Sequence, residues 1–286
     1  MTGPTKGLLY MFLATIVLAC MHGLVRYLSG ELHPFVIAFY RNLFGVIAIL
    51  PLVFRAGLPA LRSHNPRIMV LRSMSGIVAM LTWFYSLSKV PTAEATALSF
   101  TAAIFTALVA YILLKEKMKS HRWIAILGGF IGVIIVLQPD TENYNPYMLL
   151  VLVSCVFWGL SVTLVKILTR TDSVTSIVAW MSILLTVMSL PPALFYWQWL
   201  SVDQFLLLCA MGVMATIGHL AMTQALSLAD TTAVMSIDFM RLVWAALIGS
   251  YFFSDPLEIS TWVGAIIIFS SGLYVIFRES LTRENR

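Results

Sequence analysis

Apolar residues occur along this chain in runs of about twenty, separated by short segments that hold most of its charges. A helix of about twenty apolar residues is long enough to cross the hydrocarbon core of a bilayer. The pattern therefore predicts ten membrane-spanning helices, at residues 7–28, 34–54, 67–87, 92–114, 121–137, 146–168, 174–196, 203–227, 231–253 and 259–277. Their connections are short, which predicts no separate soluble domain.

The composition agrees with an all-α integral membrane protein. Apolar residues make up 60% of the chain and charged residues 11%, whereas about a quarter of an average soluble domain is charged. The net charge of +5 does not require a nucleic-acid partner, because membrane proteins collect Lys and Arg in cytoplasmic loops. The three cysteines lie inside apolar runs without the spacing of metal ligands, so we predict no metal site.

The distribution of Lys and Arg predicts the orientation. If the N-terminus is cytoplasmic, thirteen of the 18 Lys and Arg residues lie on the cytoplasmic side and only Arg26 and Lys89 lie outside. The other three, Arg41, Arg72 and Arg241, fall within spans. Since cytoplasmic loops are enriched in these residues, we predict a multi-pass protein of the cell (inner) membrane with both termini in the cytoplasm.

A weak internal repeat divides the chain. With an offset of 140 residues, LVRYL at 24–28 aligns with LVKIL at 164–168, and with an offset of 139 residues Trp123 aligns with Trp262. We therefore predict two repeats of five spans each, residues 1–140 and 141–286. Because five is odd, the second repeat is inserted upside down. Inverted repeats are an architecture of transporters that open alternately to either side around a midplane site.

Two segments give the chain a family resemblance. The segment ALSFTAAIFTALVAYILLKEKMKSHRWIAILGGFIGVIIVLQP at 97–139 closes the fourth span with KEK, opens the fifth with Trp and continues with Gly128, Gly129 and Gly132. The segment SYFFSDPLEISTWVGAIIIFSSGLYVI at 250–276 has the same pattern, with Asp255 where Glu116 stands. In these features the chain resembles the EamA-type members of the drug/metabolite transporter superfamily. The resemblance implies transport of a small molecule, a central cavity lined by helices one to four of each half, and peripheral fifth and tenth helices whose glycines serve close packing.

Charged residues within spans are expensive and are candidates for function. Arg241 lies ten residues into the ninth span, about 15 Å deep, and Asp238 lies three residues earlier on the same helical face. They form either an internal ion pair or a substrate site in which Asp238 orients Arg241 toward an acidic group. Arg41 lies seven residues from the outer end of the second span, about 10 Å deep.

Two further charges have open interpretations. Arg72 lies near the cytoplasmic surface, which it could reach with its long side chain, or it could face the cavity. Glu94 stands two residues into the fourth span, near the outer interface. It could balance Arg41 or Lys89, or it could interact with the N-terminus of its own helix.

Histidines and tryptophans complete the candidate site. His22 and His219 are the ionisable side chains within the first and eighth spans, and each is either hydrogen-bonded in the core or in contact with a proton or substrate. Trp83 lies at the end of the third span, which is typical of an interfacial aromatic belt. Trp158 and Trp244 lie deeper and are better candidates for stacking on a substrate ring.

The repeat makes the charges in the spans asymmetric. Arg41 aligns with Met181, Asp238 with Ser99 and Arg241 with Ala102. A packing requirement shared by both halves would tend to occur twice, whereas a substrate, which is not symmetric, needs its charged partner once. This asymmetry favours a binding role.

The sequence therefore predicts a secondary transporter, without enzyme activity, of a small polar or amphipathic metabolite that is amino-acid-, vitamin- or nucleotide-like and has an acidic group. The alternatives are an integral-membrane enzyme, for which we find no HExxH or nucleophile–base motif, and an assembly subunit. The predicted substrate-binding residues are Arg241, Asp238, Arg41, His219, His22, Trp158, Trp244 and Glu94. We predict no cofactor and, since no Walker A sequence is present, no ATP-driven transport by this chain; a coupling ion or proton and a homodimer are left open.

Overall fold

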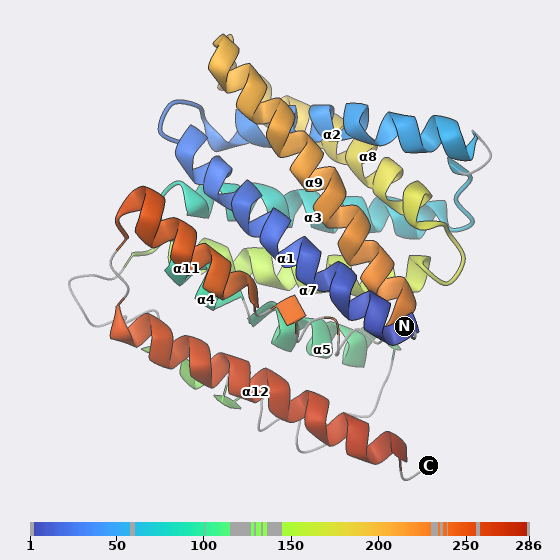
Figure 1. The fold of residues 1–286 in the computed structure, drawn as a ribbon, viewed down its shortest axis with the longest axis vertical. Helices are drawn as coiled ribbons and strands as arrows, with labels where there is room; N and C mark the ends of the chain where they lie inside the picture. The colour runs from blue at the N-terminus through green and yellow to red at the C-terminus, as the bar shows by residue number, and fades with distance from the viewer. Residues whose placement is uncertain are drawn as a thin grey trace.

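The protein is an all-α bundle in the computed structural model (Figure 1). The structure describes residues 3–57, 61–99, 101–114, 127–128, 130–132, 134–135, 145–229, 234, 237–238, 240–255 and 258–284. Its helices are α1 (Gly3–Leu28), α2 (Pro34–Ala56), α3 (Pro66–Leu87), α4 (Thr92–Ser99), α5 (Thr101–Leu114), α7 (Met148–Leu168), α8 (Val174–Leu194), α9 (Val202–Leu228), α11 (Met240–Phe253) and α12 (Ile259–Glu284). The predicted fold class, an all-α integral membrane protein, is confirmed.

Helices occur at each predicted span in the described part of the chain. Six of them (α1, α2, α3, α7, α8 and α9) are long and apolar enough to cross a membrane. The fourth predicted span is formed by α4 and α5, and the ninth and tenth by α11 and α12. Of the fifth predicted span, 121–137, only residues 127–128, 130–132 and 134–135 are described, and these are helical.

Local signals in the sequence fix where several helices begin. Ser173 caps α8, and Ser201 with Gln204 forms a capping box at the start of α9. At α2, Nδ1 of His33 accepts a hydrogen bond from the backbone N–H of Phe35 at 3.3 Å. Burial, and then the positive charge of Lys89, lower the pKa of His33, which favours the neutral ring. In the tautomer protonated at Nε2, Nδ1 can accept this hydrogen bond.

The helices pack in pairs that combine the two repeats. Helix α1 lies along α9, α3 lies along α7, and α2 lies along α8. The offset of about 140 residues relates α1 to α7, α2 to α8 and α3 to α9. Applied to the pair α1 and α9, this offset gives α7 and α3, which also pack together. Applied to α2 and α8, it gives the same pair again. This is the arrangement that an inverted repeat requires.

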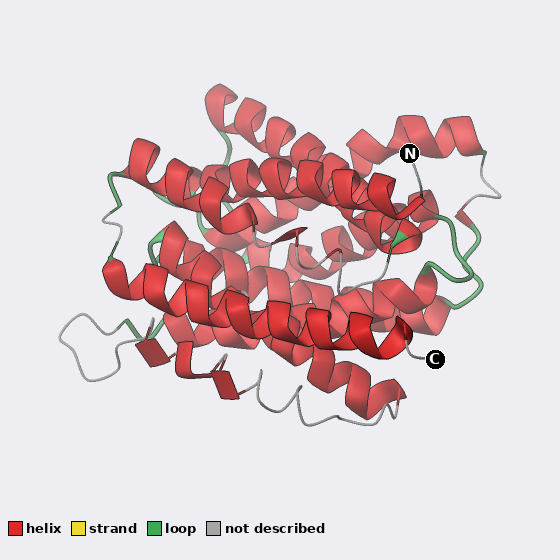
Figure 2. Ribbon diagram, turned by 60° about the horizontal axis from the view of Figure 1, so that its bottom comes forward, coloured by secondary structure: helices red, strands yellow, loops and turns green. Residues whose placement is uncertain are grey.

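The loops meet at two opposite ends of the bundle. At one end, the side chain of Asn145 donates to the carbonyl oxygen of Lys89 at 2.8 Å, and His33 stacks on Tyr196 with ring centroids 3.6 Å apart. At the other end, the backbone N–H of His64 donates to Asp172 at 2.8 Å. The predicted outer loops thus share one end and the predicted inner loops share the other, with both chain termini on a single side of the bundle (Figure 2). That this side is cytoplasmic stays a prediction from the charge distribution.

Glycines allow the closest helix contacts. A methyl group on Gly212 of α9 would lie 2.8 Å from the carbonyl carbon of Phe44 and 2.9 Å from the backbone nitrogen of Gly45 in α2. In the fifth predicted span, a methyl group on Gly128 would lie 2.5 Å from Oγ of Ser271 in α12. This contact agrees with the predicted packing role of that glycine; Gly129 lies outside the described residues.

Candidate substrate site

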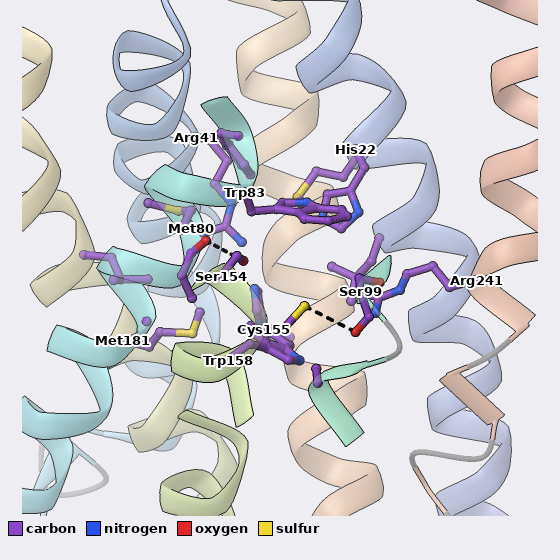
Figure 3. A pocket seen from close by; sticks show the side chains of 18 of the residues that line it. His22, Arg41, Met80, Trp83, Ser99, Ser154, Cys155, Trp158, Met181 and Arg241 are labelled. Atoms are coloured by element: carbon purple, nitrogen blue, oxygen red, sulfur yellow. Dashed lines mark hydrogen bonds between the residues drawn. The ribbon is translucent and has the colours of Figure 1, made fainter. Parts of the chain in front are cut away.

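A cavity lies between the two repeats, and helices from both of them line it (Figure 3). Its volume, about 80 Å³, is enough for several water molecules. The described lining residues are Leu18, Met21, His22, Arg41, Arg72, Gly76, Ala79, Met80, Trp83, Phe84, Ser99, Ala102, Ser154, Cys155, Trp158, Met181, Leu185, His219 and Arg241. Three of these residues are arginines and none is acidic.

The predicted pair of Arg241 and Asp238 is present. Nη2 of Arg241 donates to Oδ2 of Asp238 at 2.8 Å, and the two residues are 8% and 5% exposed. Arg241 lines the cavity, whereas Asp238 is not among the described lining residues. The carboxylate therefore compensates the charge of Arg241 from beside the cavity, and both interpretations of the pair, structural and binding, agree with this geometry.

Arg41 faces the cavity through a network of neutral groups. Its Nη1 donates to Oδ1 of Asn42 at 2.6 Å, and Asn42 donates in turn to Oγ of Ser189 at 3.3 Å. Arg41 is 4% exposed, and its Nε has no partner among the described residues. The amide positions this guanidinium without cancelling its charge.

Arg72 does not reach the surface. It is 4% exposed and lines the cavity. Its Nε and Nη1 are buried without a hydrogen-bond partner in the described part of the protein. The interpretation of Arg72 as a surface-seeking side chain is therefore wrong, because α3 is covered on this face by α7 and α8.

Two pairs of aromatic rings border the cavity, and the helices that carry one pair correspond in the repeat to the helices that carry the other. His22 of α1 and Trp83 of α3 meet edge to face with ring centroids 5.3 Å apart. Trp158 of α7 and His219 of α9 have ring centroids 6.2 Å apart. In the view of Figure 3, Trp83 and His22 lie on one side of the cavity and Trp158 on the other.

The placement of Trp83 in an interfacial belt is wrong, because the residue is 8% exposed and lines the cavity. Its spacing from Arg72, Gly76 and Met80, which lie on the same helical face, was the signal that could have located it.

Two predicted site residues lie away from the cavity lining. Trp244 donates from Nε1 to Oγ1 of Thr15 at 3.3 Å. Glu94 lies in the first turn of α4, two residues after Thr92, whose hydroxyl accepts from Arg26 at 2.9 Å. No ion pair joins Glu94 to Arg41 or Lys89 among the described residues. The position of Glu94 instead agrees with the alternative of an acid near a helix N-terminus.

Uncharged counterparts of the predicted charges also line the cavity. Ser99, Ala102 and Met181 align in the repeat with Asp238, Arg241 and Arg41. Equivalent positions of the two halves therefore converge on a single site, and the charges occur in only one half of each aligned pair.

A family model matches the chain twice, at residues 5–138 and 145–278, and its description is EamA-like transporter family. The chain belongs to this family. The two matches cover most of the sequence and fall within the two predicted repeats. The protein is therefore a small-metabolite transporter with a multi-pass membrane fold rather than an enzyme.

Relatives across almost the whole length include transporters named for two different metabolites. The S-adenosylmethionine uptake transporter of Rickettsia felis is 32% identical over 254 residues, which cover 89% of this chain and 86% of the relative. The riboflavin transporter of Rhizobium johnstonii is 30% identical over 283 residues, which cover 98% and 93%. A solved crystal structure matches with a TM-score of 0.70 and 14% identity, over 95% of this chain and 96% of the other, which supports the fold alone.

Proposed function

We propose that this chain carries a small metabolite with an acidic group and a flat ring across the membrane, and that the cavity between the repeats binds it. The observation that supports this proposal is the meeting of three guanidinium groups with two indoles and two imidazoles in a single buried space. The proposed contacts are Arg41, Arg241 with its neighbour Asp238, and the rings of the two aromatic pairs.

The charges of the site favour an acidic substrate. Three arginines line the cavity, and Asp238 compensates one of them. Two cationic groups are left without a paired acid among the described residues. Buried charges without a partner are strongly destabilising. A carboxylate or phosphate of the substrate would provide the missing partner through charge-assisted hydrogen bonds.

The aromatic residues favour a substrate with a ring. Trp83 and Trp158 offer large apolar faces, and His22 and His219 lie against them. Both compounds named for the relatives, S-adenosylmethionine and riboflavin, contain flat ring systems, and the first also has a carboxylate. S-adenosylmethionine, which has both features, is therefore the first candidate, and riboflavin, which has the ring system without an acidic group, is the second.

Transport by alternating access agrees with the inverted repeat. Polar contacts join segments at both ends of the bundle, and a rocking of one repeat against the other would exchange which end is open. The distribution of Lys and Arg supports an inner-membrane topology with both termini in the cytoplasm. If a proton drives transport, His22 and His219 are the candidate groups within the cavity.

Uptake into proteoliposomes tests this proposal. The purified protein would be reconstituted and offered radiolabelled S-adenosylmethionine and riboflavin, each with and without an excess of other ring-bearing acids and their neutral analogues. We expect uptake above that of empty liposomes, and stronger competition from the acids. Equal competition by acids and neutral analogues would exclude the acidic class, and no uptake of any ring compound would exclude the ring-bearing class.

A further inference from the structure

Four residues on one face of α3 line the cavity, and their side chains change from charged to aromatic along the helix. Arg72, Gly76, Met80 and Trp83 all line it, with spacings of four, four and three residues. Such spacings keep side chains on a single helical face. Arg72 and Trp83 are eleven residues apart, which corresponds to about 16 Å along the helix axis. The cavity thus has a cationic region and an aromatic region that belong to the same helix.

The three cavity arginines are not equivalent as binding groups. Arg241 is paired with Asp238, and Nη1 of Arg41 donates to the amide oxygen of Asn42. Nε and Nη1 of Arg72 are buried, and neither atom donates a hydrogen bond to a carboxylate or an amide among the described residues. Since α3 is packed against α7 and α8 on this side, the guanidinium is shielded from bulk solvent and its open side is the cavity.

A second unpartnered polar group lies beside Arg72. Oγ of Ser161, on α7, is buried without a hydrogen-bond partner among the described residues, and Ser161 is 1% exposed. A methyl group on Gly76 would lie 3.2 Å from Nη1 of Arg72 and 3.7 Å from Oγ of Ser161. Two donors from different repeats therefore both adjoin the position that a side chain at residue 76 would occupy. Arg72 and Gly76 line the cavity, and Ser161 lies behind them, outside the described lining.

We propose that Arg72 and Ser161 form the subsite that binds the oxyanion of the substrate, a carboxylate or a phosphate. The proposal rests on the proposed function and names the part of the cavity that selects the acidic class. A guanidinium presents N–H groups in one plane that match two oxygens of an oxyanion, and the serine hydroxyl donates a further hydrogen bond. Arg241, whose charge Asp238 compensates from beside the cavity, then contacts the rest of the substrate.

This role predicts opposite effects of Arg72 on stability and on binding. Without a ligand, the unpaired buried charge destabilises the protein, so an apolar side chain of similar length should stabilise it. With an acidic ligand, the same charge is the main source of recognition. A purely structural arginine would behave differently, because its removal would lower stability with or without ligand.

Two matched pairs of probes test the subsite. Riboflavin 5′-phosphate differs from riboflavin by a phosphate, and S-adenosylmethionine differs from its decarboxylated form by a carboxylate. The melting temperature of the purified full-length protein in detergent would be measured with each probe over a range of concentrations. For the wild type, we expect the acidic member of at least one pair to stabilise the protein more than its partner does.

The same measurements on four variants then show which residue causes the preference for the acidic probe. We expect Arg72→Met to raise the melting temperature of the ligand-free protein and to weaken binding of the acidic probe on the order of 10- to 100-fold. Ser161→Ala should weaken it less. Gly76→Ala keeps both donors but displaces the guanidinium, so it should reduce the acid preference without the gain in stability. Arg67→Met, which removes an exposed cation from the same helix, is the matched control and should change neither quantity.

The outcomes separate the subsite from the transport proposal. If the wild type prefers the acidic probe and Arg72→Met prefers it equally, the subsite assignment is wrong while the proposed function stands. The assignment is also wrong if Arg72→Met lowers the ligand-free melting temperature or does not fold while Ser161→Ala and Gly76→Ala keep full acid preference. If no probe stabilises the wild type, the proposed substrate class fails, and the subsite fails with it.

Discussion

At the scale of single residues, Arg241 and Asp238 determine how much charge the cavity presents. Their side chains are joined at 2.8 Å and both are almost completely buried. Removal of either partner leaves an uncompensated buried charge, which typically destabilises a protein by about 3–5 kcal/mol. The sign of the charge left behind differs between the two single variants, and this difference can be measured in substrate binding.

We therefore predict opposite effects of two single substitutions on acidic ligands. Arg241→Gln leaves the Asp238 carboxylate uncompensated beside the cavity and should weaken binding of an acidic probe, whereas Asp238→Asn leaves a cation and should preserve or strengthen it. Both variants should melt at lower temperature, and the double variant with Asn and Gln should recover most of the lost stability and of the acid preference. Calorimetric titration of the four proteins checks this. If acid preference is lost in the double variant, Arg241 itself holds the oxyanion and the assignment to Arg72 is wrong.

The residues of the site differ in how far the sequence could reveal them. The pairing of Arg241 with Asp238 could be predicted because a three-residue spacing within one helix places side chains together whatever surrounds them. The burial of Arg72 and Trp83 could not, because it depends on which helices cover α3, and α7 and α8 come from the other repeat. Trp244 lies at a depth similar to Trp158, but contacts with α1 turn it away from the cavity lining.

At the scale of helices, backbone contacts between the repeats hold the cavity walls together. The spans themselves were readable from the sequence, because an apolar run of a given length is sufficient to define a membrane helix. Which glycines lie at helix contacts was not, since glycines occur in several spans without a periodic pattern. In the structure, Gly212 of α9 meets the backbone of α2 at Phe44 and Gly45. The hydroxyl of Thr216 reinforces this contact by donating to the carbonyl oxygen of Gly45 at 3.1 Å.

This contact predicts an asymmetry between two alanine substitutions. A methyl group on Gly212 would lie 2.8 Å from a backbone carbon, which cannot move aside, whereas one on Gly45 would meet its nearest atom, Oγ1 of Thr216, at an ordinary 3.5 Å. We expect Gly212→Ala to lower the free energy of unfolding by about 1–3 kcal/mol and Gly45→Ala to have little effect. Melting curves and size-exclusion profiles of both variants provide the measurement. Equal tolerance of the two substitutions would show that α2 and α9 can separate freely.

At the scale of the whole molecule, polar contacts join segments of the chain at both ends of the bundle. At the predicted outer end, Arg26 of α1 forms an ion pair with Asp255, donates to the hydroxyl of Thr92, and lies over the ring of Phe253 at 4.5 Å. These contacts join α1, α4 and the end of α11. At the other end, Asp172 accepts hydrogen bonds from the segment before α3. Alternating access requires that each set of contacts can open while the other holds.

The protein contains its own reporter of this opening, because Cys155 lines the cavity and is 2% exposed. With Cys20 and Cys209 replaced by Ser, a charged thiol reagent that does not cross membranes would modify Cys155 only through an open end of the cavity. We predict slow modification in the parent and a rate on the order of tenfold higher in Asp255→Asn, since the weakened ion pair shifts the equilibrium toward an open outer end by about 1.4 kcal/mol.

The side from which the reagent acts decides both orientation and mechanism. Reagent added to intact cells should reach Cys155 faster in Asp255→Asn, whereas reagent added to inverted membrane vesicles should reach it more slowly, because a population shifted toward one open state is withdrawn from the other. Asp172→Asn, at the opposite end, is the matched variant and should show the reverse pattern. A faster reaction from both sides in either variant would indicate local loosening rather than alternation. If Asp255→Asn instead reacts faster in inverted vesicles and Asp172→Asn faster in intact cells, the two ends are assigned the wrong way round and the termini lie outside the cell.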